Sequence, residues 1–112
     1  MDLLSRTEEI VLLTVYQLDG NAYGVTIRSE VEANTSINMS VGAVYVPLER
    51  LTKRGLLKTR AGEPTPERGG RSKRYYQITA DGLAALQEVQ RLHQALWANL
   101  PDPLALPQAE LA

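Results

Sequence analysis

The hydrophobic period of the chain changes at Gly55, and this change limits the possible folds more than any other feature. Before Gly55, apolar residues recur every three or four positions, as in amphipathic helices. After it, the short alternating segments 56–60 and 73–79 flank 61–72, whose prolines, glycines and charges predict a loop. From Thr79 the helical period returns, and prolines beyond residue 100 end it. The expected order is therefore a set of helices, a hairpin with a long loop, and a last helix.

Capping residues set the start of the first helix. Ser5 and Glu8 fit a capping box, in which each side chain bonds the backbone of the other residue. The turn sequence at 19–21 ends this helix. The apolar residues in between predict that it is buried, and they are Ile10, Val11, Leu12, Leu13, Val15, Tyr16 and Leu18.

Two more helices are expected before the change of period. One begins near Tyr23 and Gly24 and frays within 33–36. Ser40 is the expected N-cap of the next, and Gly55 its C-terminal stop. The residues expected to face the core from these two helices are Ile27, Val31, Val44, Leu48 and Leu51.

Alternation in the second predicted strand separates its two faces. Tyr76 and Ile78 are expected to face the core. The other face would hold Lys73, Tyr75 and Gln77. Thr79 then caps the last helix.

Basic residues gather in the same part of the chain as the hairpin. Residues 41–80 contain nine basic and three acidic residues, whereas the rest contains three basic and ten acidic residues. A positive zone on a chain of net charge −1 concentrates attraction for a polyanion on one surface. The alternative is a solvated loop with scattered charges, which charge alone favours, so the order of the secondary-structure elements has to decide between the two interpretations.

Composition excludes several classes of function. The 112-residue chain is 44% hydrophobic and 22% charged, as expected for one folded domain that gains from a partner subunit. It has no cysteine, which excludes disulfides, thiolate catalysis and cysteine metal sites. With one histidine, no nucleophile–base pair and no phosphate-binding loop, we expect neither enzyme, metal nor cofactor. The lack of a leader or a long apolar run predicts a cytoplasmic protein without membrane contact.

Three helices followed by a basic hairpin predict a winged helix-turn-helix, mainly α with a small β-hairpin. In this fold the third helix enters the major groove of DNA, and the hairpin, called the wing, reaches the neighbouring backbone or minor groove. The expected organisation is a DNA-binding domain over 1–79, a dimerisation helix over 80–100 and a proline-containing tail over 101–112. The positive zone then lies on the wing.

Two stretches combine several short motifs, SVGAVYVPLERLTKRGLL at 40–57 and GGRSKRYYQITADGLAAL at 69–86. They resemble the PadR family of bacterial transcriptional regulators, and the AYG at 22–24 also fits the family's second helix. The matching positions are Gly42, Tyr45, Leu48, Arg50, Leu51, Gly55, Leu56, Gly70, Arg71, Arg74, Tyr75, Tyr76, Thr79 and Gly82. The resemblance covers about residues 7–100 and implies a homodimeric DNA-binding repressor of the short subfamily, with one C-terminal helix for dimerisation.

One position departs from that pattern. Many members have proline directly after the helix-three tyrosine, whereas here Val46 follows Tyr45 and Pro47 comes next. A proline so far inside a helix removes one backbone hydrogen bond and is expected to kink it. We expect this to alter how Tyr45 and the first turn lie in the groove.

The candidate DNA-binding residues come from the third helix and the wing. Small residues at the helix start allow close backbone approach to DNA, and the wing cations can bind phosphates. Tyr45 is either a core aromatic or a phosphate donor, and the resemblance favours the donor. The complete set is Ser40, Val41, Gly42, Ala43, Tyr45, Arg50, Arg68, Arg71, Lys73 and Arg74.

The last helix contains a heptad-like seam suited to packing across a two-fold axis. Its members are Leu86, Val89, His93, Leu96 and Leu100, and Trp97 is added to them as a residue of the dimer interface. Trp97 is interpreted as an anchor of the dimer contact. A sharper hypothesis places a small aromatic effector at Trp97 and His93.

Together these features predict a homodimeric repressor that binds an inverted-repeat operator in double-stranded DNA and is released by a small-molecule effector. The two half-sites would lie about 34 Å apart, one helical turn. The alternative is a winged-helix module that binds a protein where DNA would otherwise lie, without sequence-specific DNA binding.

Overall fold

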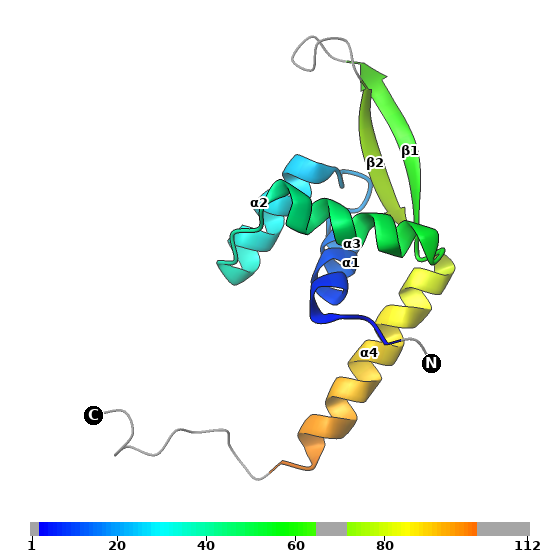
Figure 1. Cartoon of the computed structure of the whole chain (residues 1–112). Helices are drawn as coiled ribbons and strands as arrows, with labels where there is room; N and C mark the ends of the chain where they lie inside the picture. Colours follow the sequence, from blue (N-terminus) through cyan, green and yellow to red (C-terminus); the bar gives the residue numbers. More distant parts are fainter. Residues whose placement is uncertain (1–2, 65–71, 101–112) are drawn as a thin grey trace, which may run out of the picture.

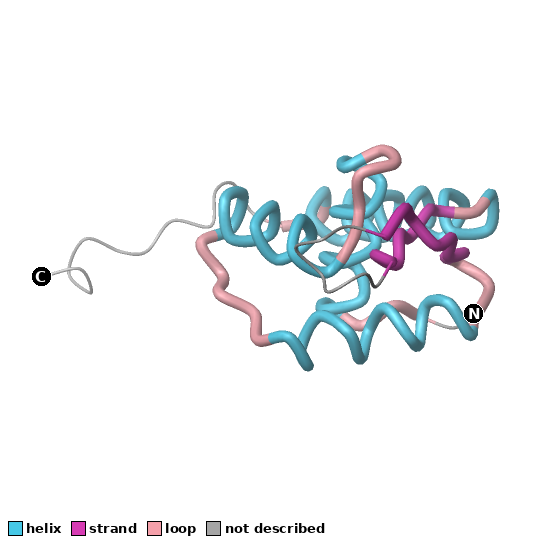
Figure 2. Tube along the Cα trace, turned by 90° about the horizontal axis from the view of Figure 1, so that it is seen from above, coloured by secondary structure: helices cyan, strands magenta, loops and turns pink. Residues whose placement is uncertain are grey.

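The computed structural model describes residues 3–64 and 72–100 of the chain. Its elements are α1 (Arg6–Leu18), α2 (Gly24–Thr35), α3 (Val41–Lys53), β1 (Leu57–Pro64), β2 (Ser72–Ile78) and α4 (Ala80–Ala98). Figure 1 shows the hairpin rising on one side of α1–α3, while α4 runs away from them on the other side. Seen from above in Figure 2, the strands lie toward one end of the layer of helices. The predicted fold, a winged helix with an added C-terminal helix, is confirmed.

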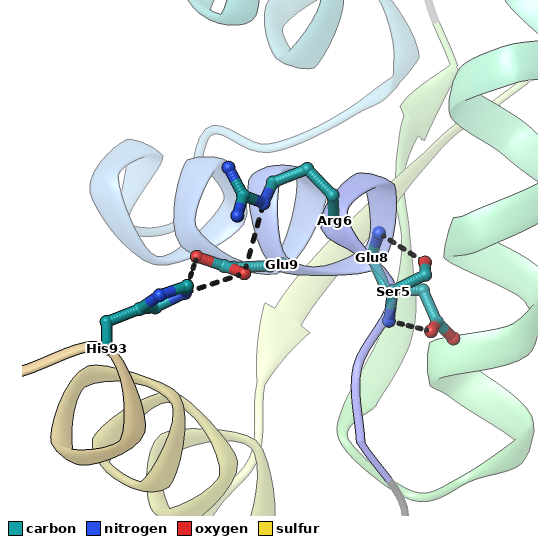
Figure 3. Close-up of polar contacts among 5 residues, drawn as sticks. All are labelled: Ser5, Arg6, Glu8, Glu9 and His93. Carbon is teal, nitrogen blue, oxygen red and sulfur yellow. Dashed lines mark hydrogen bonds and ion pairs between the residues drawn. The ribbon is translucent and has the colours of Figure 1, made fainter. Parts of the chain in front are cut away.

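The predicted capping residues begin the helices for the expected reason. In α1, the Ser5 N–H donates to Glu8 Oε1 at 2.8 Å, and the Glu8 N–H donates to Ser5 Oγ at 3.1 Å, as Figure 3 shows. Ser40 Oγ accepts from the Ala43 N–H at 3.1 Å, and Thr79 Oγ1 accepts from the Gly82 N–H at 3.0 Å. Each cap satisfies a backbone donor that the helix itself leaves unpaired.

The core forms where the apolar faces of α1–α3 meet the base of the hairpin. The five residues predicted to face inward from α2 and α3 are all at most 1% exposed. Tyr76 of β2 is 2% exposed, as its place in the alternation predicts. The complete buried cluster is Val11, Leu12, Val15, Ala22, Ile27, Val31, Met39, Val44, Leu48, Leu51, Leu56, Leu57 and Tyr76. Helix α3 continues through Pro47, which is itself buried.

Two residues of α1 contradict the prediction of a wholly buried helix. Leu13 and Tyr16 are exposed, although they belong to the same apolar run as the buried Val11 and Leu12. A helix that packs against its neighbours on one side leaves its opposite face outside the core, whatever its composition. Both residues line a groove that α4 completes.

The wing has longer strands than its composition suggested. Residues 61–64 and Ser72 were predicted to be loop but belong to the strands, and the pairing is irregular between Ala61 and Pro64. Glycine inside a strand marks a bulge or a close approach, and the Tyr75 ring lies where a side chain on Gly62 would point. Gly62 therefore fits inside an irregular strand, which ends at Pro64.

Helix α4 is attached to the turn between α3 and the wing. The Thr79 N–H donates to the Leu56 carbonyl at 3.1 Å, and the Thr79 hydroxyl donates to the Gly55 carbonyl at 2.7 Å. Gly55 has φ 76°, the left-handed conformation expected of a helix-terminating glycine. No described helix is long and apolar enough to cross a membrane.

Candidate nucleic-acid interface

The outward face of α3 begins with small and apolar side chains. Ser40, Val41, Gly42 and Ala43 are all exposed at its N-terminus, as a helix that enters a groove requires. Arg50 is also exposed, one turn after Val46. Val44, Pro47 and Leu48 form the opposite, buried face. The predicted residues of α3 therefore lie on one accessible surface.

Tyr45 contacts the start of α2 and remains accessible. Its side chain is 39% exposed, and its ring and hydroxyl lie where a side chain on Gly24 would point. Gly24 lacks a side chain, which allows the tyrosine of α3 to lie directly against the N-terminus of α2. The ring of Tyr45 thus packs against α2, while the residue stays accessible at the surface. Tyr45 combines features of the two roles considered from the sequence, a core aromatic and a phosphate donor.

An aromatic pair attaches the wing to α2. The Tyr23 and Tyr75 rings meet edge to face, with centroids 5.4 Å apart. Arg60 lies 4.4 Å over Tyr75, and Lys73 lies 4.5 Å over Tyr23. Arg60 also donates to the Gly20 carbonyl at 3.1 Å, and Lys73 Nζ lies 3.4 Å from the Tyr23 hydroxyl. Two cations are therefore held on the face of the wing that meets the start of α2.

The other face of β2 reaches α3. Arg74 pairs with Glu49 across 3.7 Å, and both side chains are more than half exposed. An ion pair this accessible adds little stability. It does show that the wing and the outward face of α3 adjoin. Arg68 and Arg71, the other predicted wing contacts, lie outside the described residues.

The residues predicted for dimerisation differ in exposure between the start and the end of the last helix. Leu86 packs against the core, while Leu96, Trp97 and Leu100 are exposed. His93 Nε2 lies 3.1 Å from Glu9 Oε1 of α1 (Figure 3). His93 and Val89 also line a groove of about 660 Å³ between α1 and α4. The complete lining is Glu9, Leu13, Tyr16, Leu83, Leu86, Gln87, Val89, Gln90, His93 and Gln94.

Two buried ionisable groups have shifted pKa values. Burial alone would raise the pKa of Glu8, but hydrogen bonds with Ser5 and the charge of Arg54, 3.4 Å away, outweigh it and lower that pKa. Burial raises the pKa of the Tyr76 hydroxyl, and nearby Arg74 offsets part of this rise. Both groups lie in the scaffold behind the interface.

The chain matches a known family of proteins over most of its length. The family model of the transcriptional regulator PadR-like family matches residues 12–88, more than half of the chain. The chain belongs to the PadR-like family. The match includes α2, α3 and the wing, so the described surface lies within the family's shared domain.

Solved structures of PadR-like and related regulators share this fold. A transcriptional regulator from Clostridium thermocellum superposes with a TM-score of 0.68 at 22% identity, covering 81% of this chain and 85% of that one. A PadR family regulator from Eggerthella lenta has a TM-score of 0.63 at 29% identity, covering 78% and 73%. A PadR-like factor from Bacteroides fragilis has a TM-score of 0.66 at 26% identity, covering 80% and 81%. No curated protein matches.

Sequence reasoning missed several residues of the interface. Tyr23 and Arg60 complete the aromatic contact with the wing, and Glu49 pairs with Arg74. Val46 is 51% exposed on the outward face of α3. The helical period could have predicted the position of Val46, because Val46 lies four residues after Gly42 and so shares the face of α3 that holds Gly42.

Proposed function

We propose that this PadR-like regulator binds double-stranded DNA as a homodimer and represses transcription from an inverted-repeat operator. Helix α3 of each subunit enters the major groove, and the wing contacts the adjacent phosphates. We infer no catalytic role. Two-fold symmetry then makes the two half-sites identical and about 34 Å apart.

One observation carries this proposal: the accessible face of α3 and the cations of the wing form a continuous surface. Arg74 reaches Glu49 of α3, Tyr45 of α3 lies on the start of α2, and Tyr23 there meets Tyr75 of the wing. Apolar and small groups thus adjoin positive charge, the arrangement needed to contact bases and phosphates together.

The exposed end of α4 supports assembly as a dimer. Leu96 and Trp97 at the end of α4, and Leu100 just after it, form an accessible apolar segment, whereas the first half of the helix packs on its own subunit. Exposed apolar surface of this kind is typical of an interface. We infer that an effector binds in the groove between α1 and α4 beside His93, where it would change the angle of α4 and the spacing of the two α3 helices. Trp97, the other residue predicted for this site, is not among the residues that line the groove.

The salt dependence of DNA binding tests the proposal. We expect Lys73→Ala to weaken binding to a duplex and to lower the log–log salt slope by about 0.9 for the lost phosphate contact. Arg91→Ala is the matched control, because it also removes one positive charge, from an exposed side chain on α4 paired with Glu88. Fluorescence anisotropy titrations at several salt concentrations measure both slopes. Equal slopes for wild type and Lys73→Ala would contradict the wing assignment.

The second candidate function is a winged-helix module that binds a protein. The exposed valines of α3 are the observation that favours it, since apolar side chains also suit a protein contact. Such a module would not depend on the wing cations or prefer any DNA sequence, so the same titrations distinguish it.

A further inference from the structure

We propose that Val46 contacts the 5-methyl group of a thymine in the major groove, and so makes the protein prefer thymine at one position of each half-site. This inference rests on the proposed function, and it names the base and the residue responsible for part of the specificity.

The position of Val46 in α3 is the first argument. Val44 and Leu48 flank it in the sequence and are fully buried, so the helical period turns Val46 away from the core. Gly42, one turn earlier, shares this outward face. Apart from its two chain neighbours and the nearby backbone of α3, no described heavy atom lies within 4 Å of where a Cβ on Gly42 would be. The backbone can therefore approach the bases closely beside Val46.

The chemistry of the exposed side chains is the second argument. Bases are distinguished in the major groove by bidentate hydrogen bonds from amide, guanidinium or carboxylate groups, or by apolar contact with the thymine methyl. The exposed side chains over 41–46 are valine, alanine and tyrosine, with one glycine. These two turns can offer apolar contacts and a single hydroxyl. Contact with a thymine methyl is the base recognition that this chemistry allows.

Val46 is half exposed and lines an open hollow with Ser5 and Thr7 at the start of α1. A β-branched residue on an exposed helix face has a lower helix propensity than alanine. Its side chain is stiff, however, so little rotamer entropy is lost when it contacts a partner. The cations of the neighbouring wing provide the attraction to DNA, which leaves Val46 the role of recognition.

Uracil substitution tests this directly, because uracil lacks the methyl group of thymine and keeps its hydrogen-bonding groups. The operator recovered from a pool of random duplexes is resynthesised with uracil replacing each thymine in turn. At one position per half-site, the wild-type protein should lose about four-fold in affinity, or about 15-fold when both half-sites are changed. Val46→Ala should bind the thymine and uracil operators within two-fold of each other.

Val25→Ala is the matched control. It makes the same substitution at an exposed valine, 58% accessible, on α2 instead of α3, and should keep the full wild-type loss on uracil DNA. Circular dichroism checks that Val46→Ala folds, as an exposed valine-to-alanine change in a helix should.

The outcomes separate this inference from the proposed function. A selected operator whose uracil forms bind the wild type equally well would overturn the role of Val46 and leave the DNA-binding function intact. The same holds if Val46→Ala keeps the wild-type sensitivity to uracil. A protein that enriches no sequence at all would overturn both.

Discussion

Replacing Gly82 by alanine should destabilise the protein, although helix propensity alone predicts the opposite. Gly82 is buried in the first turn of α4, where α4 meets the turn after α3. A Cβ at this position would overlap the Leu56 carbonyl oxygen and lie 2.6 Å from Ile78 Cγ1. The Leu56 carbonyl is fixed because it accepts the Thr79 N–H at 3.1 Å. Backbone held this way cannot move aside without breaking the attachment of α4.

The size of the effect follows from two opposing terms. Overpacking costs about 1–3 kcal/mol of unfolding free energy. The cost of Gly82→Ala should lie near the upper end of this range, because the group in the way is the backbone carbonyl of Leu56. Alanine gains at most about 1 kcal/mol over glycine in a helix. The net loss of unfolding free energy is therefore about 2 kcal/mol, which corresponds to roughly 8 °C in Tm for a chain of this length.

Denaturant and thermal unfolding of Gly82→Ala measure this loss, with Gly42→Ala as the control. The control makes the same change at a helical glycine in open space, so its stability should be unchanged or slightly higher. If Gly82→Ala were as stable as the wild type, α4 would not attach to the domain as described.

Three further predictions concern the scaffold. Because Glu8 has a lowered pKa in the folded state, unfolding free energy should fall as the pH drops below about 4.5, and Glu8→Gln should remove that part of the dependence. Tyr76→Phe should keep or raise the unfolding free energy, by at most about 1 kcal/mol, because the buried hydroxyl has no hydrogen-bond partner within the described ranges. Chemical denaturation measures both. Ser40→Ala should lose about 1 kcal/mol in the same assay, because it removes the N-cap of α3.

The helices were predictable because their determinants are local. Ser5, Ser40 and Thr79 cap the backbone three residues ahead, and the residues facing inward follow the period of 3.6. Alternation in β2 placed Tyr76 correctly in the core. Each of these signals lies within a few residues of the feature that it specifies.

The contacts of the interface were not predictable because they join distant parts of the chain. Alternation placed Tyr75 on the outer face of the wing, but it does not show that Tyr23 would meet it there. The same limit applies to Glu49 and Arg74. The longer strands were missed for a related reason, since cross-strand pairing around Gly62 overrides a composition typical of loops.

A selection from a pool of random duplexes at near-physiological salt tests the central claim most directly. The wild-type protein is compared with the Arg71→Ala, Lys73→Ala double variant. Our account predicts that the wild type enriches an inverted repeat with half-sites about one helical turn apart, and that the variant loses this enrichment. No enriched sequence, or binding that depends on salt but not on sequence, would contradict a site-specific dimeric regulator.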